Sequence, residues 1–356
     1  MNPFFELIAI AQGRLQGFSS PLSEEQWKEV TLTAFKQSLG GVMAEAFFDR
    51  LPTEQFPSHQ VFMAWMCMHK QVALDNGILN ERSAEVYRIF SEAGFKCCIL
   101  KGQAVARFYP KPEERNSGDI DIWVDGDRDA ILSFLRERWE VENVVYHHAE
   151  VKMFEKTEVE VHFTPSWMYN PVINRRLQEW FRANKASQFT NEIPGLGFAA
   201  PTSAFDAVFS MVHIYRHLLE EGVGLRQVMD YYYILHHLND DARRAAYRVL
   251  CSLRMRRFAG ALMYVEKAVF ALDEGLMVCA PDAKAGRFLL DEIMTAGNFG
   301  QFDPRYAKRA GEGRMKRFMR KMWRQMRFVA QYPSEVLWFP GYRLWQFCWR
   351  KIKKYD

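Results

Sequence analysis

The chain has 356 residues, of which 49% are hydrophobic and 25% are charged, and its formal net charge is +4. This length allows a large core and two lobes, while the mild charge gives the whole molecule no strong preference for nucleic acid. No apolar run approaches about 18 residues, so we expect no membrane-spanning helix. The N-terminal sequence does not have the pattern of a signal peptide, and six cysteines without metal-ligand spacing favour reduced thiols in a cytoplasmic protein.

Residues 1–94 have the pattern of an N-terminal helical region. Ser23 and Gln26 form a capping-box signature before an apolar helical stripe, so a helix is expected to begin there. One further helix is predicted through 61–67 and another over about 81–93. The apolar spacing needs only a core, so we expect these helices to pack internally rather than to form a partner surface.

Residues 95–165 are predicted to form an αβ core. Two further strands, 151–154 and 157–163, are predicted as a hairpin at the end of this core. Along the second of them, Glu158, Glu160 and His162 share one face. The elements expected before the hairpin are a strand at 96–100, a helix at 102–109, a strand at 119–124 and a helix at about 127–138.

Proline and glycine interrupt residues 166–200, for which we expect an irregular connector that wraps the core. Helical periodicity returns over 201–300, which is predicted to form a helical lobe. It includes a helix over about 225–237. The chain is therefore expected to consist of a helical region, a sheet-containing core, a connector and a second helical region.

Two pairs of histidines are weak candidates for a metal site. His213 and His217 lie four residues apart on one helix face, as metal ligands can. No acid pair accompanies them, so we expect satisfied or exposed helix histidines instead. His147 and His148 lie near a strand end and are expected to be exposed.

The last segment, residues 301–356, is basic and aromatic. Ten basic residues between Arg305 and Arg327 surround a helical stripe of methionine and aromatic side chains. We expect the stripe to pack on the helical lobe, with the basic residues in solvent. The alternative is that residues 305–354 bind an anionic membrane surface or an acidic partner, at the membrane periphery, and sequence-specific DNA binding is not expected. The stripe consists of Met315, Phe318, Met319, Met322, Trp323 and Met326.

The strand predicted at 119–124 carries the strongest chemical signal. Its alternation places Ile120 and Ile122 on one face and Asp119 and Asp121 on the other. Two neighbouring carboxylates repel, and a protein normally keeps such a pair where a cation or a proton offsets the repulsion. Hard divalent cations take oxygen ligands, so the pair points to Mg²⁺ (or Mn²⁺) beside a substrate phosphate.

With their neighbours, these aspartates resemble the bacterial uncharacterised nucleotidyltransferase family of the DNA polymerase β-like nucleotidyltransferase superfamily. The matching motifs are Leu100-Lys101-Gly102, Tyr109-Pro110, Arg115, Asp119-Ile120-Asp121 and Glu160-Val161-His162. The resemblance implies an α+β fold, in which a small mixed β-sheet core is flanked by N-terminal and C-terminal helical regions. It also implies metal-dependent transfer of an NMP group from an NTP, such as ATP, to a hydroxyl of an unknown acceptor.

The resemblance also assigns a role to each motif residue. Asp119, Asp121 and Glu160 would be the catalytic acids and the ligands of Mg²⁺ or Mn²⁺. His162, Arg226 and Asp230 are candidates for substrate contacts, although Arg226 and Asp230 could also form an ion pair one helical turn apart. The nucleotide would be bound by Lys101, Gly102, Gln103, Arg115 and Gly118, because N–H groups at a helix start suit an anion.

Three features depart from the superfamily pattern. Gln103 follows Gly102 where serine or glycine is usual, the spacing to Asp119 is longer, and a glutamate, Glu160, replaces the commoner aspartate. Two alternatives therefore stay open. One is a catalytically silent member of the fold that binds a nucleotide or a protein, and the other is a toxin-neutralising type that modifies a partner protein.

Overall fold

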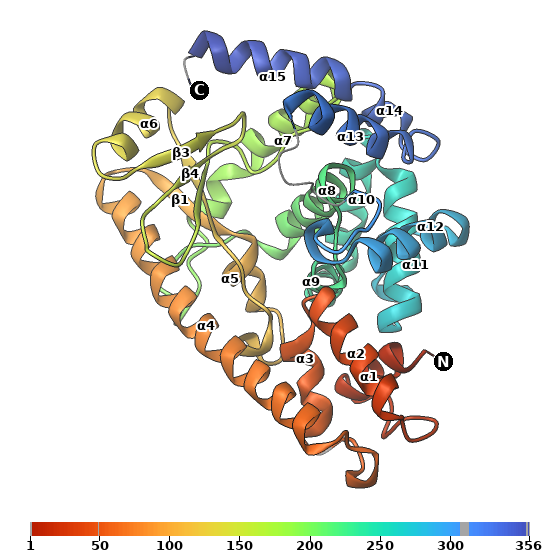
Figure 1. Cartoon of the computed structure of the whole chain (residues 1–356). Helices are drawn as coiled ribbons and strands as arrows, with labels where there is room; N and C mark the ends of the chain where they lie inside the picture. The colour runs from red at the N-terminus through yellow and green to blue at the C-terminus, as the bar shows by residue number, and fades with distance from the viewer. Residues whose placement is uncertain (1, 49, 307–312, 354, 356) are drawn as a thin grey trace.

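The computed structural model describes residues 2–48, 50–306, 313–353 and 355. An N-terminal helical region, a mixed sheet and a larger helical region are arranged around the centre of the molecule, and the last helices lie across the top (Figure 1). None of the described helices is long and apolar enough to cross a membrane. Short 3-10 helices occupy Glu45–Phe47, Thr53–Gln55, Pro112–Glu114, Glu274–Leu276 and Asn298–Gly300.

The N-terminal region is built on one long helix, α4, His59–Glu92. Two separate helices were predicted here, but no proline interrupts the segment and a single buried stripe runs along it. Trp65, Val72, Leu79 and Val86 lie seven residues apart, which keeps them on one side of the helix. The N-terminal half of α4 packs in the core of the N-terminal region, and its C-terminal half packs on the sheet. The other helices of the region are α1, Pro3–Ala11, α2, Glu24–Lys36, and α3, Gly40–Ala44.

A five-stranded mixed sheet confirms the predicted α+β fold. Its order is β1-β2-β5-β4-β3, with β2 and β5 parallel and the other neighbours antiparallel. The hairpin strand predicted at 151–154 lies at 148–151 instead, and the additional strand β3 was not predicted because its four residues show no clear alternation. The strands are β1, Lys96–Leu100, β2, Ile120–Asp125, β3, Val141–Val144, β4, His148–Val151, and β5, Val159–His162.

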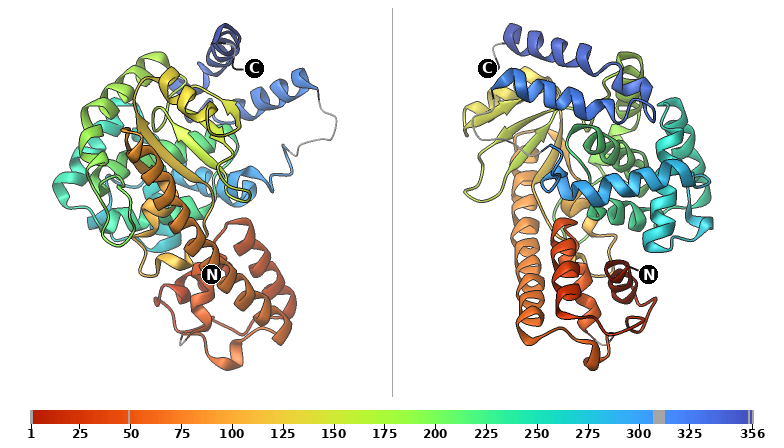
Figure 2. Two further views of the ribbon diagram at one scale, coloured as in Figure 1. Left: turned by 90° about the vertical axis from the view of Figure 1, so that its left-hand side faces the viewer. Right: turned by 45° about the vertical axis from the view of Figure 1, so that its right-hand side comes forward.

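Helices cover both faces of the sheet (Figure 2). One face packs on α4 and on α6, Arg128–Arg136, through the alternating side chains Ile120, Ile122 and Val124. The other face packs on α7, Pro171–Phe189, and α8, Ser203–Glu220, where Trp123 contacts Phe189 and Phe205. Both faces of the sheet are therefore buried along most of its length.

Helix α7 is a correction to the predicted irregular connector at 166–200. Pro171 occupies the first helical position, where its missing N–H costs nothing, and the Asn170 side chain caps the helix. Ile173, Leu177 and Phe181 then form a buried stripe at four-residue spacing. The proline that suggested a break in fact begins the helix.

The larger helical region continues the chain beyond α8 as predicted. Its helices are α9, Leu225–His236, α10, Asp240–Ser252, α11, Arg256–Phe270, and α12, Ala283–Ala296. The last three helices are α13, Arg314–Met326, α14, Pro333–Val336, and α15, Phe339–Lys353. They lie above the sheet and α8 (Figure 1).

Most of the apolar stripe of α13 does not pack on the helical lobe as expected, although Met322 is partly buried against the core. Met315 and Trp323 are 72% and 71% exposed, while Arg324 on the opposite side is 5% exposed. Helix α8 supplies the physical reason, since the carbonyl oxygen of its Leu219 accepts hydrogen bonds from Arg324 and Gln325. Two of the ten basic residues counted in this segment, Lys308 and Arg309, lie outside the described residues.

Candidate active site

The turn between β1 and α5, Lys101–Ala106, begins the site. Lys101 adopts a φ of 48°, a left-handed conformation that is uncommon for a residue with a side chain. Such strain is kept where the surrounding structure requires it, and here it directs the ammonium group of Lys101 toward Asp121. The turn therefore delivers a positive charge to the end of β2.

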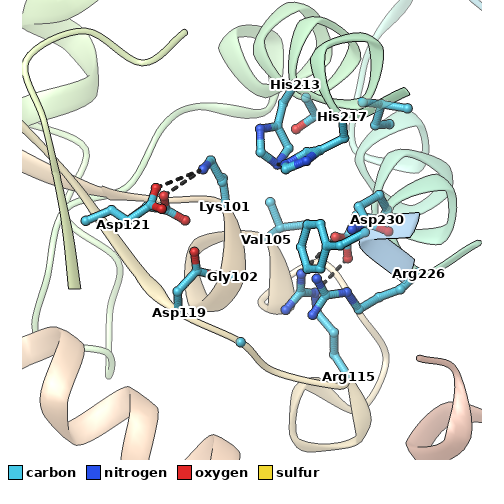
Figure 3. A pocket seen from close by; sticks show the side chains of 16 residues that line it. Lys101, Gly102, Val105, Arg115, Asp119, Asp121, His213, His217, Arg226 and Asp230 are labelled. Carbon is cyan, nitrogen blue, oxygen red and sulfur yellow. Dashed lines mark hydrogen bonds and ion pairs between the residues drawn. The ribbon is translucent and has the colours of Figure 1, made fainter. Parts of the chain in front are cut away.

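Three carboxylates come together beside this turn. Asp121 and Glu160 are register partners on the parallel strands β2 and β5, so their side chains project from the same face of the sheet. Asp119 immediately precedes β2. One carboxylate oxygen from each of the three lies within 4.8 Å of the others. Figure 3 shows Asp119 and Asp121 facing Lys101 across the end of the strand.

A lysine and two histidines surround two of the three acids. The Lys101 Nζ lies 2.6 Å from Asp121 Oδ1 and 4.0 Å from Glu160 Oε2. His162 Nε2 lies 2.7 Å from Asp121 Oδ1 and 3.2 Å from Glu160 Oε2, and His148 Nδ1 lies 3.1 Å from Glu160 Oε2. Burial opposes the charge of Glu160, but hydrogen bonds from His148 and His162 outweigh it and hold the pKa well below its usual range.

Asp119 has different surroundings. It forms no ion pair within the described part of the chain, and burial together with the charges of Asp121 and Glu160 raises its pKa to about 6. A cation bound beside Asp119 would stabilise the ionised form of its carboxylate. The oxygen-rich donor set, with one uncompensated acid, therefore fits a divalent cation.

A buried ion pair lies at the opposite wall of the site. Arg115 donates two hydrogen bonds to Asp230, at 2.6 and 2.8 Å, and Tyr109 donates a third at 2.7 Å. Arg226 donates to the carbonyl oxygens of Asn116 and Ser117, in the loop that leads to Asp119. The sequence allowed an ion pair between Arg226 and Asp230. In the structure Asp230 pairs with Arg115 instead, and Arg226 holds the loop before Asp119 in place.

The structure does not bring every predicted nucleotide-binding residue into the site. The Gln103 side chain is buried against α4, where it donates to Asn80 Oδ1 at 2.8 Å, so a nucleotide contact by this side chain is wrong. Arg115 lines the cavity, but Asp230 already balances its charge. Gly118 lies exposed at the mouth, and Lys101 and Gly102 line the cavity wall.

Comparison with known protein families identifies the chain. A family model described as an uncharacterised nucleotidyltransferase matches residues 23–271. The chain belongs to this family. No curated protein sequence matches this nucleotidyltransferase.

A similarity to a solved structure is weaker. The Thermotoga maritima CCA-adding enzyme complexed with tRNA matches with 11% sequence identity, over 77% of this chain and 84% of that chain. The TM-score is 0.21, and a similarity at this level carries no argument. The assignment of the nucleotidyltransferase therefore depends on the family match and on the site itself.

Three histidines that sequence reasoning did not place in the site of this nucleotidyltransferase belong to its lining. His148, expected to be exposed, is buried because β4 pairs with β5 and sets it opposite His162. His213 and His217 lie on the side of α8 that faces the acids, with their Nε2 atoms 3.0 Å apart. Burial and the nearby charge of Lys101 lower the pKa of His213 well below its ordinary value.

His147 also differs from the expectation of exposure, because its ring stacks on Trp167 and is buried. The four-residue spacing of His213 and His217 was the one sequence signal that pointed to a shared face. Only the packing of α8 against the sheet shows that this face is turned toward the carboxylates.

In the nucleotidyltransferase, two cavities meet near these groups: a small one of about 80 Å³ at the acids and a larger one of about 850 Å³ beneath α13.

Proposed function

We propose that this nucleotidyltransferase transfers an NMP group from an NTP to an acceptor hydroxyl with the help of Mg²⁺ or Mn²⁺. The observation that carries the proposal is the convergence of Asp119, Asp121 and Glu160 beside the Lys101 turn. Paired cations held by such carboxylates stabilise the attacking and leaving oxygens of an in-line displacement. In the reaction, the acceptor oxygen forms a bond to the α-phosphorus, the bond between the α and β phosphates breaks, and pyrophosphate leaves.

The residues of the chain supply binding and orientation. Lys101 and the backbone of Gly102 would face the phosphates, since an ammonium group and an N–H at a helix start both attract anions. His162 orients the carboxylates of Asp121 and Glu160 through its hydrogen bonds, and His148 Nδ1 lies within ion-pair distance of Glu160. Arg226 and the Arg115–Asp230 pair support the loop before Asp119, and in this proposal they act as positioning residues.

The burial of Gln103 gives a structural explanation for this departure from the superfamily pattern. In the sequence, Gln103 follows Gly102 where serine or glycine is usual. In the structure, its side chain joins α5 to α4 through Asn80 and Asn76. The residue therefore has a packing role that is independent of the phosphate site. The modification of a partner protein remains an alternative identity for the acceptor.

We also propose a cytoplasmic location with contact to an anionic membrane surface. The exposed stripe Met315, Met319, Trp323 and Met326 on α13 supports this proposal, since an apolar helix face beside basic residues suits a lipid headgroup region. Lys316 and Lys351 are exposed on α13 and α15 and supply positive charge to the same end of the molecule.

The proposal is tested by incubating the full chain with each α-labelled NTP, Mg²⁺ or Mn²⁺ and cell extract. Label should appear in a new product that depends on the divalent cation, and the Asp119→Asn, Asp121→Asn double variant should not form it. Glu158→Gln serves as the matched control because Glu158 is an exposed carboxylate next to β5. Equal labelling by the double variant and the wild type would place the active site elsewhere.

A further inference from the structure

The larger cavity reaches the acids from the side of Glu160. Both cavities are lined by Lys101 and Glu160, and also by His213, His217 and Phe299. Asp119 and Asp121 line the small cavity but not the larger one. The carboxylates can thus be approached from two directions. A transfer reaction needs this, because two reactants must meet in line at one phosphorus atom.

The wall of the larger cavity is strongly basic. Seven lysines and arginines line it, against three glutamates. One of them, Arg216, is already paired with Glu220 at 2.9 Å and Glu335 at 3.5 Å. Helix α13 contributes Arg317, Arg320, Lys321 and Arg324, and α15 contributes Arg343.

Four of these seven cations form no ion pair with a carboxylate in the part of the chain that the structure describes. Arg317, Lys321, Arg324 and Arg343 form no ion pair with any acid in the described ranges. Arg324 is nearly fully buried, and burial lowers its pKa although its hydrogen bond to Leu219 remains. Glu220 acts on Lys321 and Arg343, and Glu292 and Asp303 act on Arg324, but the bases along this wall outnumber the acids, so a ligand that brings negative charge stabilises it.

On the basis of the proposed function, we propose that the larger cavity holds the acceptor, a small hydroxyl-bearing molecule that carries a phosphate group. The volume of about 850 Å³ lies within the range of sites for small molecules. Trp167 and Tyr342 add aromatic side chains to the wall. The cations hold the phosphate, the acceptor hydroxyl reaches the carboxylates at Glu160, and its proton passes to water as the new bond to phosphorus forms.

The test is calorimetric titration of ribose 5-phosphate, and separately of ribose, into the full chain with Mg²⁺ and α,β-methylene-ATP, which cannot transfer its NMP group. Lys321→Gln with Arg343→Gln removes one cavity cation each from α13 and α15. Lys316→Gln with Lys351→Gln removes two exposed cations from the same helices and is the matched control. We expect the cavity variant to bind ribose 5-phosphate at least about tenfold more weakly, while the control and the affinity for the ATP analogue stay unchanged.

The inference is overturned if ribose and ribose 5-phosphate bind with equal affinity, or if neither binds. It is also overturned if the two double variants lose affinity for ribose 5-phosphate equally. A third contrary result is a parallel loss of affinity for the ATP analogue in the cavity variant. The last result would assign the cavity to the triphosphate of the NTP. Failure of the proposed function is seen separately, since no labelled product would then form with any of the α-labelled NTPs. In that case the titration without analogue still decides whether the cavity binds phosphate.

Discussion

The unequal surroundings of Asp119 and Asp121 predict that neutralising them has opposite effects on the metal-free protein. Asp121 is 1% exposed and contacts both Lys101 and His162. Asp119 faces two like charges and forms no ion pair within the described chain. We therefore expect Asp119→Asn to raise the free energy of unfolding and Asp121→Asn to lower it.

The structure sets the size of each effect. The pKa of Asp119 is about 6, roughly two units above the ordinary value near 3.9, which corresponds to at most about 3 kcal/mol at pH 8. Water at the rim screens part of this, so we expect a gain of about 1 kcal/mol. The raised pKa means that the gain disappears as the pH falls toward about 4. Asp121→Asn leaves Lys101 with its nearest acid, Glu160, at 4.0 Å, and the expected loss is about 3 kcal/mol.

The assay is urea unfolding at pH 8 in the presence of a chelator, with Glu158→Gln as the exposed-carboxylate control. The two site variants should move the midpoint in opposite directions, and the control should leave it in place. A shift of the same sign for both variants, or a control shift of similar size, would refute the electrostatic reading of the site.

Three further predictions concern other parts of the molecule. Asp230→Asn should cost on the order of 3 kcal/mol in urea unfolding because Arg115 loses its buried partner, while the Arg115→Met, Asp230→Leu double variant should lose less; a larger loss in the double variant contradicts this. Burial raises the pKa of Asp206 to about 7, so the folded state holds its proton and stability falls as the pH rises from about 4 to 7; Asp206→Asn should flatten this slope in unfolding measured at pH 5 and pH 8, and an unchanged slope argues against it. The full chain should sediment with anionic vesicles at low salt and not with neutral ones, and Met319→Ser with Trp323→Ser should reduce this; equal sedimentation of variant and wild type would exclude the stripe as the contact.

The elements that could be predicted from the sequence are those whose pattern allows one arrangement. Strand β2 alternates between isoleucines and aspartates, and this period of two predicted which side chains face the core. It also predicted that Asp119 and Asp121 share the opposite face. The convergence with Glu160 was expected from the family resemblance rather than from spacing, because pairing between β2 and β5 is set by the whole sheet.

The elements that could not be predicted depend on tertiary contacts. The amphipathic pattern of α13 defines two faces, but it does not say which face meets the protein. The carbonyl oxygen of Leu219 and the cavity beneath the helix accommodate its arginines, and this leaves Trp323 outside. In the same way, the position of His148 follows from its pairing with His162 across two strands.

Helix α4 has a mechanical consequence for the site. Its 34 residues make a rod of about 50 Å, and Asn76 near its middle donates hydrogen bonds to the carbonyl oxygens of Glu113 and Arg115. The helix thus contacts the N-terminal helices, the sheet and the loop that ends at Asp119, and it holds the three parts in place relative to one another. We therefore expect any widening of the site during turnover to come from movement of α8 and α13 on the opposite side of the cavities. The carboxylates should keep their positions relative to α4.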